Sequence, residues 1–445
     1  MELGEYSRIG VVGGGPAGTF TAYFLLDLAK RLDLSPQVDI IEPRDFMDSG
    51  PKGCNMCGGI ISESLVQMMA TEGIHLPSEV ILDTIDTYTL HTRAGSVDIQ
   101  TPSQEMRIAS IFRGGGPRGS ETQMPLPWDS FDAFLLHLAC CKGARHIQQR
   151  VVRLSREDGR PQVHTEDGQT RTYDLLVGAV GINGPGMRLF EELDFGYKPP
   201  KTTKAFIAEF YFGEEQVERL LGHAMHVFLL DMPGLKFAAM TPKGHYATFI
   251  ILGDKIDREL VERVYAQPQV QRCMPPGWEI PVEPCHCQPR INIGPPVKPY
   301  GDRVVMVGDC GVSRLYKDGI GAAYRLGKIC AFTALTHGVS AQHFEKHYWP
   351  SCRDMAWDNR LGHLFFDVDR HLLGHDAIRT AILNVIRREQ NSPDKEPLLG
   401  GALWDTFTGS ASYRNILARA GHPSVVMQLL TETIKSFFTS PKNGS

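Results

Sequence analysis

Two cysteines three positions apart are the first residues of this sequence that could carry chemistry. Cys54 and Cys57 lie in the stretch GPKGCNMCGGII, and Gly58 and Gly59 follow the second cysteine at once. Such a pair could form a redox-active dithiol, supply half of a zinc site, or pack two small side chains against a flat surface. The spacing of the two cysteines is compatible with all three alternatives, so the choice among them depends on the rest of the sequence.

A glycine pattern near the N-terminus predicts a phosphate-binding turn. Gly13, Gly15 and Gly18 fall between residues 9–12, which read as a short buried strand, and residues 19–32, whose apolar residues recur at helical spacing. Gly13 would make the tight turn, Gly15 would let the backbone approach a pyrophosphate, and Gly18 would let helix and strand pack closely. The predicted phosphate-binding residues are Gly13, Gly15, Pro16, Ala17 and Gly18.

A carboxylate follows the next expected strand. Residues 38–41 read as a buried strand that ends on Glu42, placed to accept hydrogen bonds from a ribose hydroxyl. An acid at this position disfavours a 2′-phosphate, so the adenosine half would belong to FAD or NAD rather than NADP. The order of strand, helix and terminal acid argues against a mere tight turn.

A segment much further along the chain distinguishes between FAD and NAD as the cofactor. Residues 303–307 read as a buried strand that runs into Gly308 and Asp309, and a short loop later Asp318 and Gly319 open a helix. A carboxylate at a strand end can hold the ribityl hydroxyls of a flavin, and a glycine-rich helix start can face the flavin ring or its phosphates. The ordered pair of motifs therefore predicts FAD as the cofactor.

These motifs resemble those of the flavoprotein superfamily that includes para-hydroxybenzoate hydroxylase and the geranylgeranyl reductases. The resemblance implies that the N-terminal glycine motif and the late Gly-Asp pair hold the two ends of FAD. It implies that Asp309 contacts the ribityl or pyrophosphate region, and that the residues near the isoalloxazine are Gly319, Ile320 and Gly321. Residues 129–154 are similar to the segment that returns to the adenine side, which would place Val152 at the adenosine.

The cysteine stretch takes its meaning from the same resemblance. Residues 56–62, MCGGIIS, resemble the Cys-Gly-Gly segment that passes beside the flavin in geranylgeranyl reductases. The implied catalytic candidates are Cys54, Cys57, Gly58 and Gly59, with Cys57 nearer the ring than Cys54. The glycines would let the backbone lie flat against the cofactor. Cys57 would be a small polarisable neighbour of the ring, with a redox disulfide to Cys54 or Cys310 as the alternative.

The resemblance implies an FAD-dependent oxidoreductase. The main hypothesis is hydride transfer from the flavin to a carbon–carbon double bond of an isoprenoid or other lipid-like substrate. The alternatives are a flavin-dependent monooxygenase or halogenase, and an FAD-binding electron-transfer protein without small-molecule turnover. Val180 occupies the position at which relatives place an aspartate associated with the nicotinamide cofactor. We therefore expect slow reduction by NAD(P)H, and a reduced ferredoxin or flavodoxin as the more suitable electron donor.

The order of the motifs predicts an α/β fold with three parts. These are a discontinuous Rossmann-type FAD-binding domain, an inserted, mostly antiparallel β-sheet substrate domain, and a helical C-terminal region. The expected limits are 1–80, 125–185 and 285–345 for the FAD-binding domain, 81–124 and 186–284 for the substrate domain, and 346–445 for the helical region. β-Branched and aromatic residues predict substrate-domain strands within 88–100, 204–212, 226–230 and 246–252.

Composition excludes several other classes of protein. The 445 residues carry a net charge of -5 and no basic stripe with interleaved aromatic residues, which argues against nucleic-acid binding. Ten cysteines are too few for a disulfide scaffold and indicate a reduced, cytoplasmic protein. No signal peptide is expected, because a strand begins near Arg8, and no apolar run reaches the roughly 20 residues of a transmembrane helix.

Two further patterns point to alternatives near the end of the chain. A helix expected over residues 424–438 has apolar residues along one side, which predicts docking on the protein's own core, with peripheral membrane contact as the alternative. Cys285 and Cys287 could join Cys54 and Cys57 in a four-cysteine zinc site. Because separated pairs with this irregular spacing rarely form such sites, we expect no metal.

Overall fold

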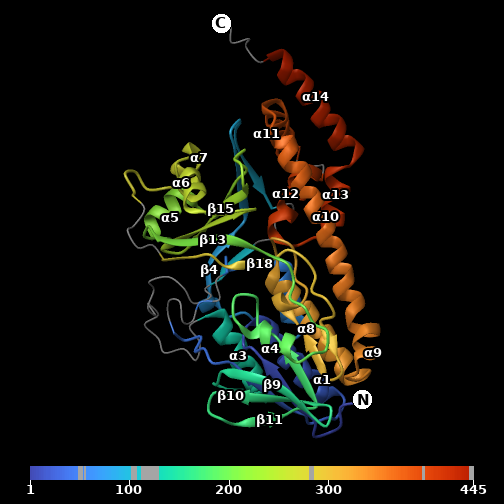
Figure 1. Cartoon of the computed structure of the whole chain (residues 1–445). Helices are drawn as coiled ribbons and strands as arrows, with labels where there is room; N and C mark the ends of the chain where they lie inside the picture. The colour runs from blue at the N-terminus through green and yellow to red at the C-terminus, as the bar shows by residue number, and fades with distance from the viewer. Residues whose placement is uncertain are drawn as a thin grey trace. The chain divides into compact units, whose positions relative to one another are not determined.

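The computed structural model describes residues 1–48, 54, 57–101, 108–111, 130–279, 285–392 and 396–439. The chain divides into two compact units, each assembled from three stretches (Figure 1). The first unit comprises Met1–Cys57, Phe112–Thr203 and Arg290–Asn359, and the second comprises Gly58–Ile111, Lys204–Pro289 and Arg360–Ser445. The limits given above for an FAD-binding domain and a substrate domain stay a prediction.

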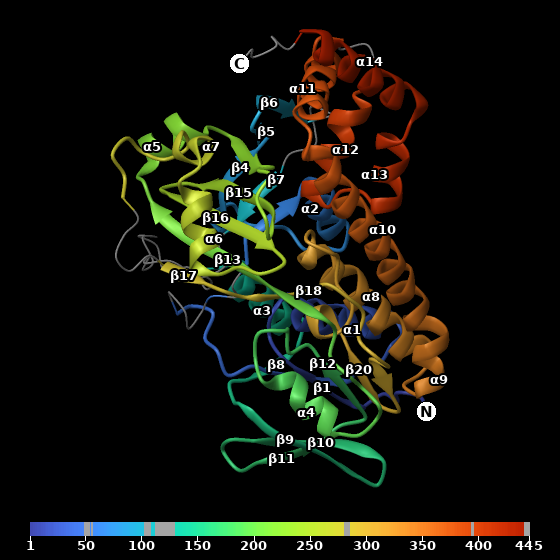
Figure 2. The same ribbon diagram turned by 45° about the horizontal axis from the view of Figure 1, so that its top comes forward.

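The first unit is built on a six-stranded, mostly parallel sheet. Figure 2 labels its strands β1, β8, β12 and β20. Among its described strands only the edge strand β19 runs antiparallel to its neighbour. The central strands are short apolar runs buried along nearly their whole length, as parallel strands covered on both faces are. In spatial order the strands are β19 (Tyr300–Gly301), β20 (Val304–Met306), β12 (Leu175–Gly178), β1 (Arg8–Val12), β2 (Gln37–Ile41) and β8 (Arg145–Ile147).

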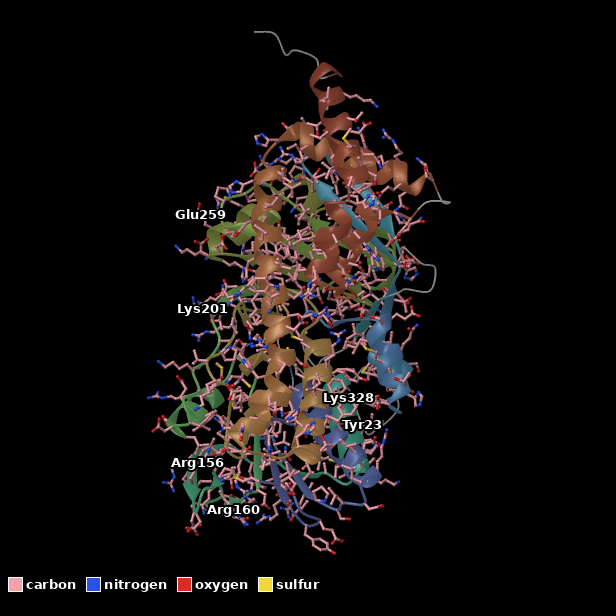
Figure 3. All side chains as sticks on the ribbon, turned by 90° about the vertical axis from the view of Figure 1, so that its right-hand side faces the viewer. Tyr23, Arg156, Arg160, Lys201, Glu259 and Lys328 are labelled. Carbon is pink, nitrogen blue, oxygen red and sulfur yellow. The ribbon has the colours of Figure 1, made fainter. Side chains whose placement is uncertain are left out.

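Two long helices of the first unit, α1 (Pro16–Arg31) and α8 (Gly319–Thr336), pack against each other. Figure 3 labels Tyr23 on α1 and Lys328 on α8. Gly327 lets the two helices approach closely, because a Cβ there would lie 2.9 Å from a hydroxyl oxygen of α1. The helix expected over 19–32 therefore exists, and it begins three residues earlier, at the proline that follows Gly15.

Smaller described elements complete the first unit, among them the short strand β18 (Arg290–Asn292). A small three-stranded antiparallel sheet has the order β11-β10-β9, and Figure 3 labels Arg156 and Arg160 at its hairpin. The strands and helices are α3 (Phe131–Cys141), β9 (Val151–Glu157), β10 (Arg160–Thr165), β11 (Thr170–Thr172), α4 (Gly186–Glu192), the 3-10 turn η3 (Gly308–Cys310), α9 (Ala341–His343) and the π-helical turn η4 (Phe344–Tyr348).

A large, mostly antiparallel sheet forms the second unit (Figure 2). Its strands follow the order β17-β13-β16-β15-β14-β5-β6, and the described pair β14–β5 is parallel. The predicted strands are present, but β15 (Leu235–Lys243) was missed because its sequence, LKFAAMTPK, has two alanines and a proline, which are poor strand formers. The other bounds are β17 (Cys285–Cys287), β13 (Thr202–Tyr211), β16 (Tyr246–Gly253), β14 (Ala224–Phe228), β5 (Thr87–Thr92) and β6 (Gly95–Gln100).

Aromatic and aliphatic side chains on one side of this sheet form the core of the second unit with helices α5 (Glu214–Leu221), α6 (Arg258–Tyr265) and α7 (Pro268–Gln271). A separate three-stranded sheet has the order β3-β7-β4. It consists of β3 (Ile60–Ser62), β7 (Ile108–Ile111) and β4 (Ile81–Ile85), and it is accompanied by α2 (Glu63–Thr71) and the 3-10 turn η2 (Ser78–Val80).

The C-terminal part of the chain is helical, as its sequence pattern predicts. Helix α10 begins in the first unit and continues into the second. No described helix combines the length and the apolar character needed to cross a membrane. The helices are α10 (Trp349–Leu373), α11 (Asp376–Gln390), α12 (Leu398–Thr408), α13 (Tyr413–Ala420) and α14 (Pro423–Thr439).

The last helix, α14, buries a different side from the one that its sequence pattern predicts. Its apolar side was expected to dock on the core, yet Leu430 and Ile434 are 52% and 56% exposed. The buried side instead presents Glu432, whose carboxylate pairs with Arg388 of α11. The burial of Glu432 beside Arg388 turns the side of α14 that carries Leu430 and Ile434 outward, so the predicted docking of that side was wrong.

Candidate functional site

The ends of adjacent strands bring the predicted cofactor residues of the first unit into one row. The backbone amides of Gly13, Ala179 and Val307 each donate to a carbonyl at the end of the neighbouring strand, at 2.9, 2.8 and 2.9 Å. Ligands of open α/β sheets bind outside this carboxyl edge. The residues that follow the strand ends there are Gly13, Glu42, Val180 and Asp309.

The glycine turn between β1 and α1 is closed too tightly for side chains. Gly13 has a φ of +109°, and a Cβ there would lie 2.3 Å from the carbonyl oxygen of Ala179. A Cβ on Gly18 would lie 1.9 Å from the Gly13 carbonyl oxygen. Gly15 is the N-cap of α1, and no side chain caps the amides of the first turn there. Those amides are consequently available to an anion.

Glu42 is buried at the end of β2 and holds the glycine turn in place. Its Oε2 accepts a hydrogen bond from the amide of Gly14 at 2.9 Å. Its Oε1 accepts from the amide and from Nε of Arg44, both at 3.1 Å. A carboxylate accepts about four hydrogen bonds, so these three donors leave a position for a ribose hydroxyl. The contact with Gly14 is a second role that the sequence did not reveal.

The late Gly-Asp pair lies beside the first turns of both long helices. A Cβ on Gly308 would lie 2.5 Å from the Cβ of Ala17, which belongs to the first turn of α1. A Cβ on Gly319, the first residue of α8, would lie 3.9 Å from Oδ1 of Asp309. The amide nitrogen of Asn292 donates to the Asp309 carbonyl at 3.0 Å and fixes this turn. Segments nearly 300 residues apart in sequence thus meet at one place.

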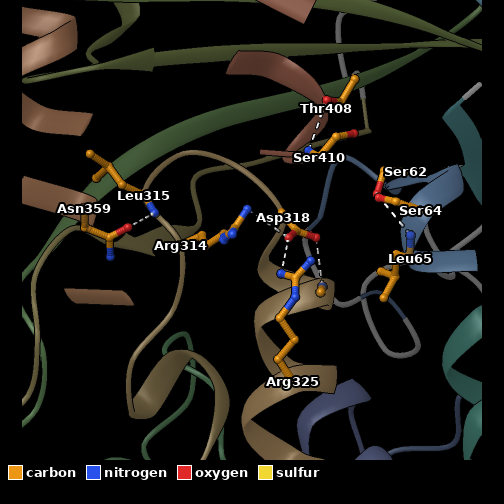
Figure 4. Close-up of polar contacts among 11 residues, drawn as sticks. Ser62, Ser64, Leu65, Arg314, Leu315, Asp318, Arg325, Asn359, Thr408 and Ser410 are labelled. Carbon is orange, nitrogen blue, oxygen red and sulfur yellow. Dashed lines mark hydrogen bonds and ion pairs between the residues drawn. The ribbon is translucent and has the colours of Figure 1, made fainter. Parts of the chain in front are cut away.

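The start of α8 is organised by a buried carboxylate (Figure 4). Asp318 caps the helix with a left-handed backbone, φ 48°, and accepts a hydrogen bond from the amide of Gly321 at 3.1 Å. Arg325 and Arg314 pair with the same carboxylate at 2.7 and 3.5 Å. A Cβ on Gly321 would lie 2.0 Å from Oδ1 of Asp318. Gly321 is therefore required by this cap, whereas the predicted proximity of Gly319, Ile320 and Gly321 to a flavin stays a prediction.

Cys54 and Cys57 are described without most of their neighbours, since residues 49–53, 55 and 56 lie outside the described residues. Both cysteines are half-buried. The Cys54 carbonyl accepts from Nη1 of Arg44 at 3.5 Å, which places it within an arginine's reach of Glu42. Cys310 is a free thiol, and burial raises its pKa to about 12. The predicted approach of Cys57 to the flavin ring stays a prediction.

Packing within the second unit accounts for the two glycines that follow. A Cβ on Gly58 would lie 2.7 Å from the side chain of Ile250. Gly59 has a φ of +69°, and a Cβ there would lie 2.5 Å from the carbonyl of Ile111 and 3.0 Å from Nζ of Lys243. The need for glycine was expected to come from a flat cofactor. The protein's own backbone and a buried ammonium group already impose it.

Lys243 is a feature that sequence analysis missed. Its side chain is 3% exposed and lies 3.5 Å from the carboxylate of Glu209, which also accepts from the buried hydroxyl of Thr248 at 3.2 Å. The three residues come from the adjacent strands β15, β13 and β16. Because strand β15 was not predicted, the sequence did not distinguish Lys243 at its end from an ordinary solvent-exposed lysine.

Val152, expected at the adenosine, lies on β9 with half of its side chain exposed, at 50%. It follows the edge strand β8, whose last residue, Ile147, accepts a hydrogen bond from the amide of Glu42 at 3.1 Å. The chain therefore leaves the sheet next to Glu42 just before it reaches Val152. A contact between Val152 and an adenosine stays a prediction.

Comparisons with known proteins find likeness in structure only. No protein-family model matches the chain, and no curated protein matches it by sequence. A flavoprotein/dehydrogenase from Cytophaga hutchinsonii matches with a TM-score of 0.64 at 13% identity, over 97% of this chain and 100% of that one. The halogenase PltM matches with a TM-score of 0.61 at 13% identity, over 97% and 96%. A structure of a PltM variant contains FAD.

A third solved structure is PqsL from P. aeruginosa, described as a probable FAD-dependent monooxygenase. It matches with a TM-score of 0.54 at 14% identity, over 82% of this chain and 98% of that one. Identities this low establish the fold alone. The chain has the fold of these flavoproteins, with a parallel sheet whose strand ends carry the residues described above.

Proposed function

We propose that this protein is an FAD-dependent oxidoreductase that holds its cofactor along the strand ends of the first unit. The observation that carries the proposal is the meeting of the Gly13 turn, Glu42 and Asp309 at one edge of a parallel sheet. The uncapped first turn of α1 fits a pyrophosphate, and the remaining acceptor position of Glu42 fits a ribose hydroxyl. The fold shared with flavoproteins supports the same assignment.

Each residue then has a defined task toward FAD. The amides at the start of α1 would hold the pyrophosphate, Glu42 the adenosine ribose, and the exposed carboxylate of Asp309 the ribityl hydroxyls. Asp318 would keep the start of α8 rigid through its two arginine partners. The bound flavin supplies the electron-transfer chemistry, and the protein supplies binding, orientation and the exclusion of water.

We infer that the reaction consumes molecular oxygen, as a monooxygenase or a halogenase does. Likeness over nearly the whole chain to a halogenase, and over most of it to a probable monooxygenase, supports this class more than reduction of an isoprenoid double bond. The reductase remains the second candidate, because the match to a protein described as a flavoprotein/dehydrogenase has a TM-score of 0.64.

A measurement of oxygen uptake distinguishes a monooxygenase or halogenase from a reductase. The FAD-loaded protein is reduced chemically without oxygen and then mixed with oxygenated buffer, aromatic acceptors and chloride or bromide. The proposal expects oxygen consumption with a hydroxylated or halogenated product. Anaerobic reoxidation of the flavin by an unsaturated lipid, with a product that has gained two hydrogen atoms, would establish the reductase instead. Anaerobic reoxidation by a ferredoxin or flavodoxin, with every small-molecule substrate unchanged in the oxygenated reaction, would indicate an electron-transfer protein.

The electron donor is part of the proposal. Val180 lies at the end of β12, where its side chain packs on the hydrophobic core and offers no charge to a nicotinamide cofactor. We expect direct flavin reduction by NADPH or NADH below about 1 s⁻¹, against typical enzyme turnover of about 10 s⁻¹. Stopped-flow absorbance measures this rate, with dithionite as the control reductant. Reduction by NADPH at the turnover rate would remove the case for a separate carrier protein.

A further inference from the structure

Two histidines and a cysteine lie together inside the second unit, far apart in sequence. Nε2 of His91 lies 2.9 Å from Nδ1 of His226, and Sγ of Cys273 lies 3.3 Å from the same Nδ1. The three potential ligand atoms are all within 4.8 Å of one another. The side chains are 6%, 8% and 2% exposed. Among the described residues this is the one cluster of three such side chains, and it does not include Cys285 or Cys287.

We propose that His91, His226 and Cys273 form a binding site for copper(I). The nitrogen and sulfur atoms already face one another on three different elements, β5, β14 and the turn after α7. A three-coordinate ion with bonds of about 2.0 Å to nitrogen and 2.3 Å to sulfur would separate the ligand atoms by about 3.5 to 3.7 Å. The two distances from Nδ1 of His226 therefore need to grow by only about half an ångström, and the third pair of ligand atoms already lies within 4.8 Å.

The outer nitrogens of both histidines have the partners that a metal site needs. Nε2 of His226 lies 3.2 Å from the carbonyl of Leu221, which can only accept, so this nitrogen carries the proton and Nδ1 is free to bind. Nδ1 of His91 lies 2.8 Å from the hydroxyl of Ser96, which can accept or donate. When Nε2 of His91 binds an ion, its proton moves to Nδ1 and is donated to Ser96. Such partners orient metal-binding histidines.

Gln269 bonds both to Cys273 and to the chain neighbour of His91. Gln269 precedes Cys273 by four residues, and its backbone carbonyl accepts from the Cys273 thiol at 3.7 Å. Its side-chain nitrogen donates to the carbonyl of Thr92, the neighbour of His91, at 3.3 Å. Its Oε1 is buried and has no hydrogen-bond partner among the described residues. A residue bonded to two sides of the cluster thus carries a buried oxygen whose hydrogen-bonding capacity is unused, a state that an additional polar group or ion would explain.

The burial of the three side chains and the charge of the resulting complex favour a monovalent ion. Cys273 belongs to the hydrophobic core, and the ring of Phe228 stacks on His91 at 4.8 Å. The charged side chains that act on the two histidines are Arg272 and Asp98, which have opposite signs. One thiolate with Cu⁺ and two neutral imidazoles is neutral, whereas Zn²⁺ would leave a buried net charge. Binding replaces the thiol proton by the copper–sulfur bond, and the proton leaves to solvent.

The test compares two cysteine–histidine pairs of equal spacing. Cys141 and His137 lie 3.3 Å apart on an exposed helix face, as Cys273 and His226 do in the core. Copper(I) is titrated anaerobically into the full chain against a chromogenic copper(I) chelator. We expect about one copper per chain in the wild type and in Cys141→Ser, and loss of that copper in Cys273→Ser. Ser96→Ala should weaken copper binding by roughly 10- to 100-fold.

X-ray absorption should report about two nitrogen ligands and one sulfur ligand on the bound copper. Circular dichroism checks that each variant is folded, and His91→Gln replaces Cys273→Ser if the latter is not. Equal copper retention by folded Cys273→Ser, loss of the copper in Cys141→Ser, or preferential retention of zinc by the wild type would each overturn the proposal. None of these readouts depends on flavin binding or on the reaction proposed for the first unit.

Discussion

The polar groups of the two units differ in where they find hydrogen-bond and ionic partners. In the first, the polar groups of the site are backbone amides at the start of a helix and an exposed carboxylate at a strand end. In the second, Lys243 pairs with Glu209, and His91 bonds to His226, all within the sheet and its core. An external ligand can complete the first arrangement without moving the protein. These groups of the second unit already have partners inside the protein, so they stabilise the fold, and a ligand at the two histidines must replace a proton.

The largest effect should come from the glycine turn. Gly13→Ala should abolish FAD retention, because its Cβ would lie 2.3 Å from a backbone carbonyl and its φ of +109° is unfavourable for alanine. Gly143→Ala is a matched control, since Gly143 has a φ of +113° with nothing within 4 Å of its Cβ. Flavin content after gel filtration measures the difference. Normal FAD retention in folded Gly13→Ala would contradict the assignment of this turn.

The buried pair of the second unit should give the next largest effect. Lys243→Met removes the ammonium group that pairs with the largely buried carboxylate of Glu209, which should lower the free energy of unfolding by about 3 to 5 kcal/mol. The double variant Lys243→Met/Glu209→Gln should recover much of this loss. Lys236→Met is the control, because its partner Asp254 is 54% exposed and the loss should stay below about 1 kcal/mol. Urea unfolding measures all three, and similar losses for Lys243→Met and Lys236→Met would remove the contrast between buried and exposed pairs.

A single carboxylate at the strand ends should have a moderate effect. Asp309→Asn should weaken FAD binding by about 1.5 to 3 kcal/mol, which corresponds to roughly 10- to 150-fold in Kd. Its side chain is exposed, so the free energy of unfolding should barely change. Fluorescence titration with FAD measures the affinity, and Glu157→Gln, an exposed carboxylate on β9, serves as the control. An unchanged Kd in Asp309→Asn would show that the late Gly-Asp pair does not hold the ribityl chain.

The smallest effect concerns a surface pair of the second unit. A hydrogen bond to Asp83 raises the pKa of His223 above 6.5, its ordinary value. The stabilisation is therefore fully present below pH 6.5 and is lost as the pH rises through the raised pKa. Because His223 is 55% exposed, we expect less than about 1 kcal/mol. His223→Gln should remove this part of the pH dependence of unfolding, and an unchanged profile would show that the pair contributes nothing.

The difference between the units also explains what the sequence could predict. Gly13, Gly15 and Gly18 lie within one strand–turn–helix, so their spacing alone indicates the turn. Asp309 was found because it also follows a recognisable buried strand. His91, His226 and Cys273 are brought together by β-sheet pairing and a turn across more than 180 residues, and no local pattern marks them. The buried side of α14 was mispredicted for the same reason, because Glu432 on that side lies beside Arg388 of another helix.

Two of the predictions concern contacts with a cofactor, and the fold of either unit does not decide them. The approach of Cys57 to a flavin and the contact of Val152 with an adenosine depend on a bound cofactor. At Gly59 the protein's own packing already requires a glycine, because a backbone carbonyl and Lys243 would meet a Cβ there, and the proximity to a flavin stays a prediction. A glycine can satisfy a packing requirement and a cofactor requirement at once, and the sequence does not separate them.

The most direct test of the central claim is the absorbance spectrum of the purified full-length protein after incubation with FAD and gel filtration. The strand-end site predicts the two visible bands of an oxidised flavin and about one noncovalently bound FAD per chain. Acid or heat should release that FAD intact. Protein that is folded by circular dichroism but retains no flavin, or that retains NAD in its place, would contradict the assignment of this edge to FAD.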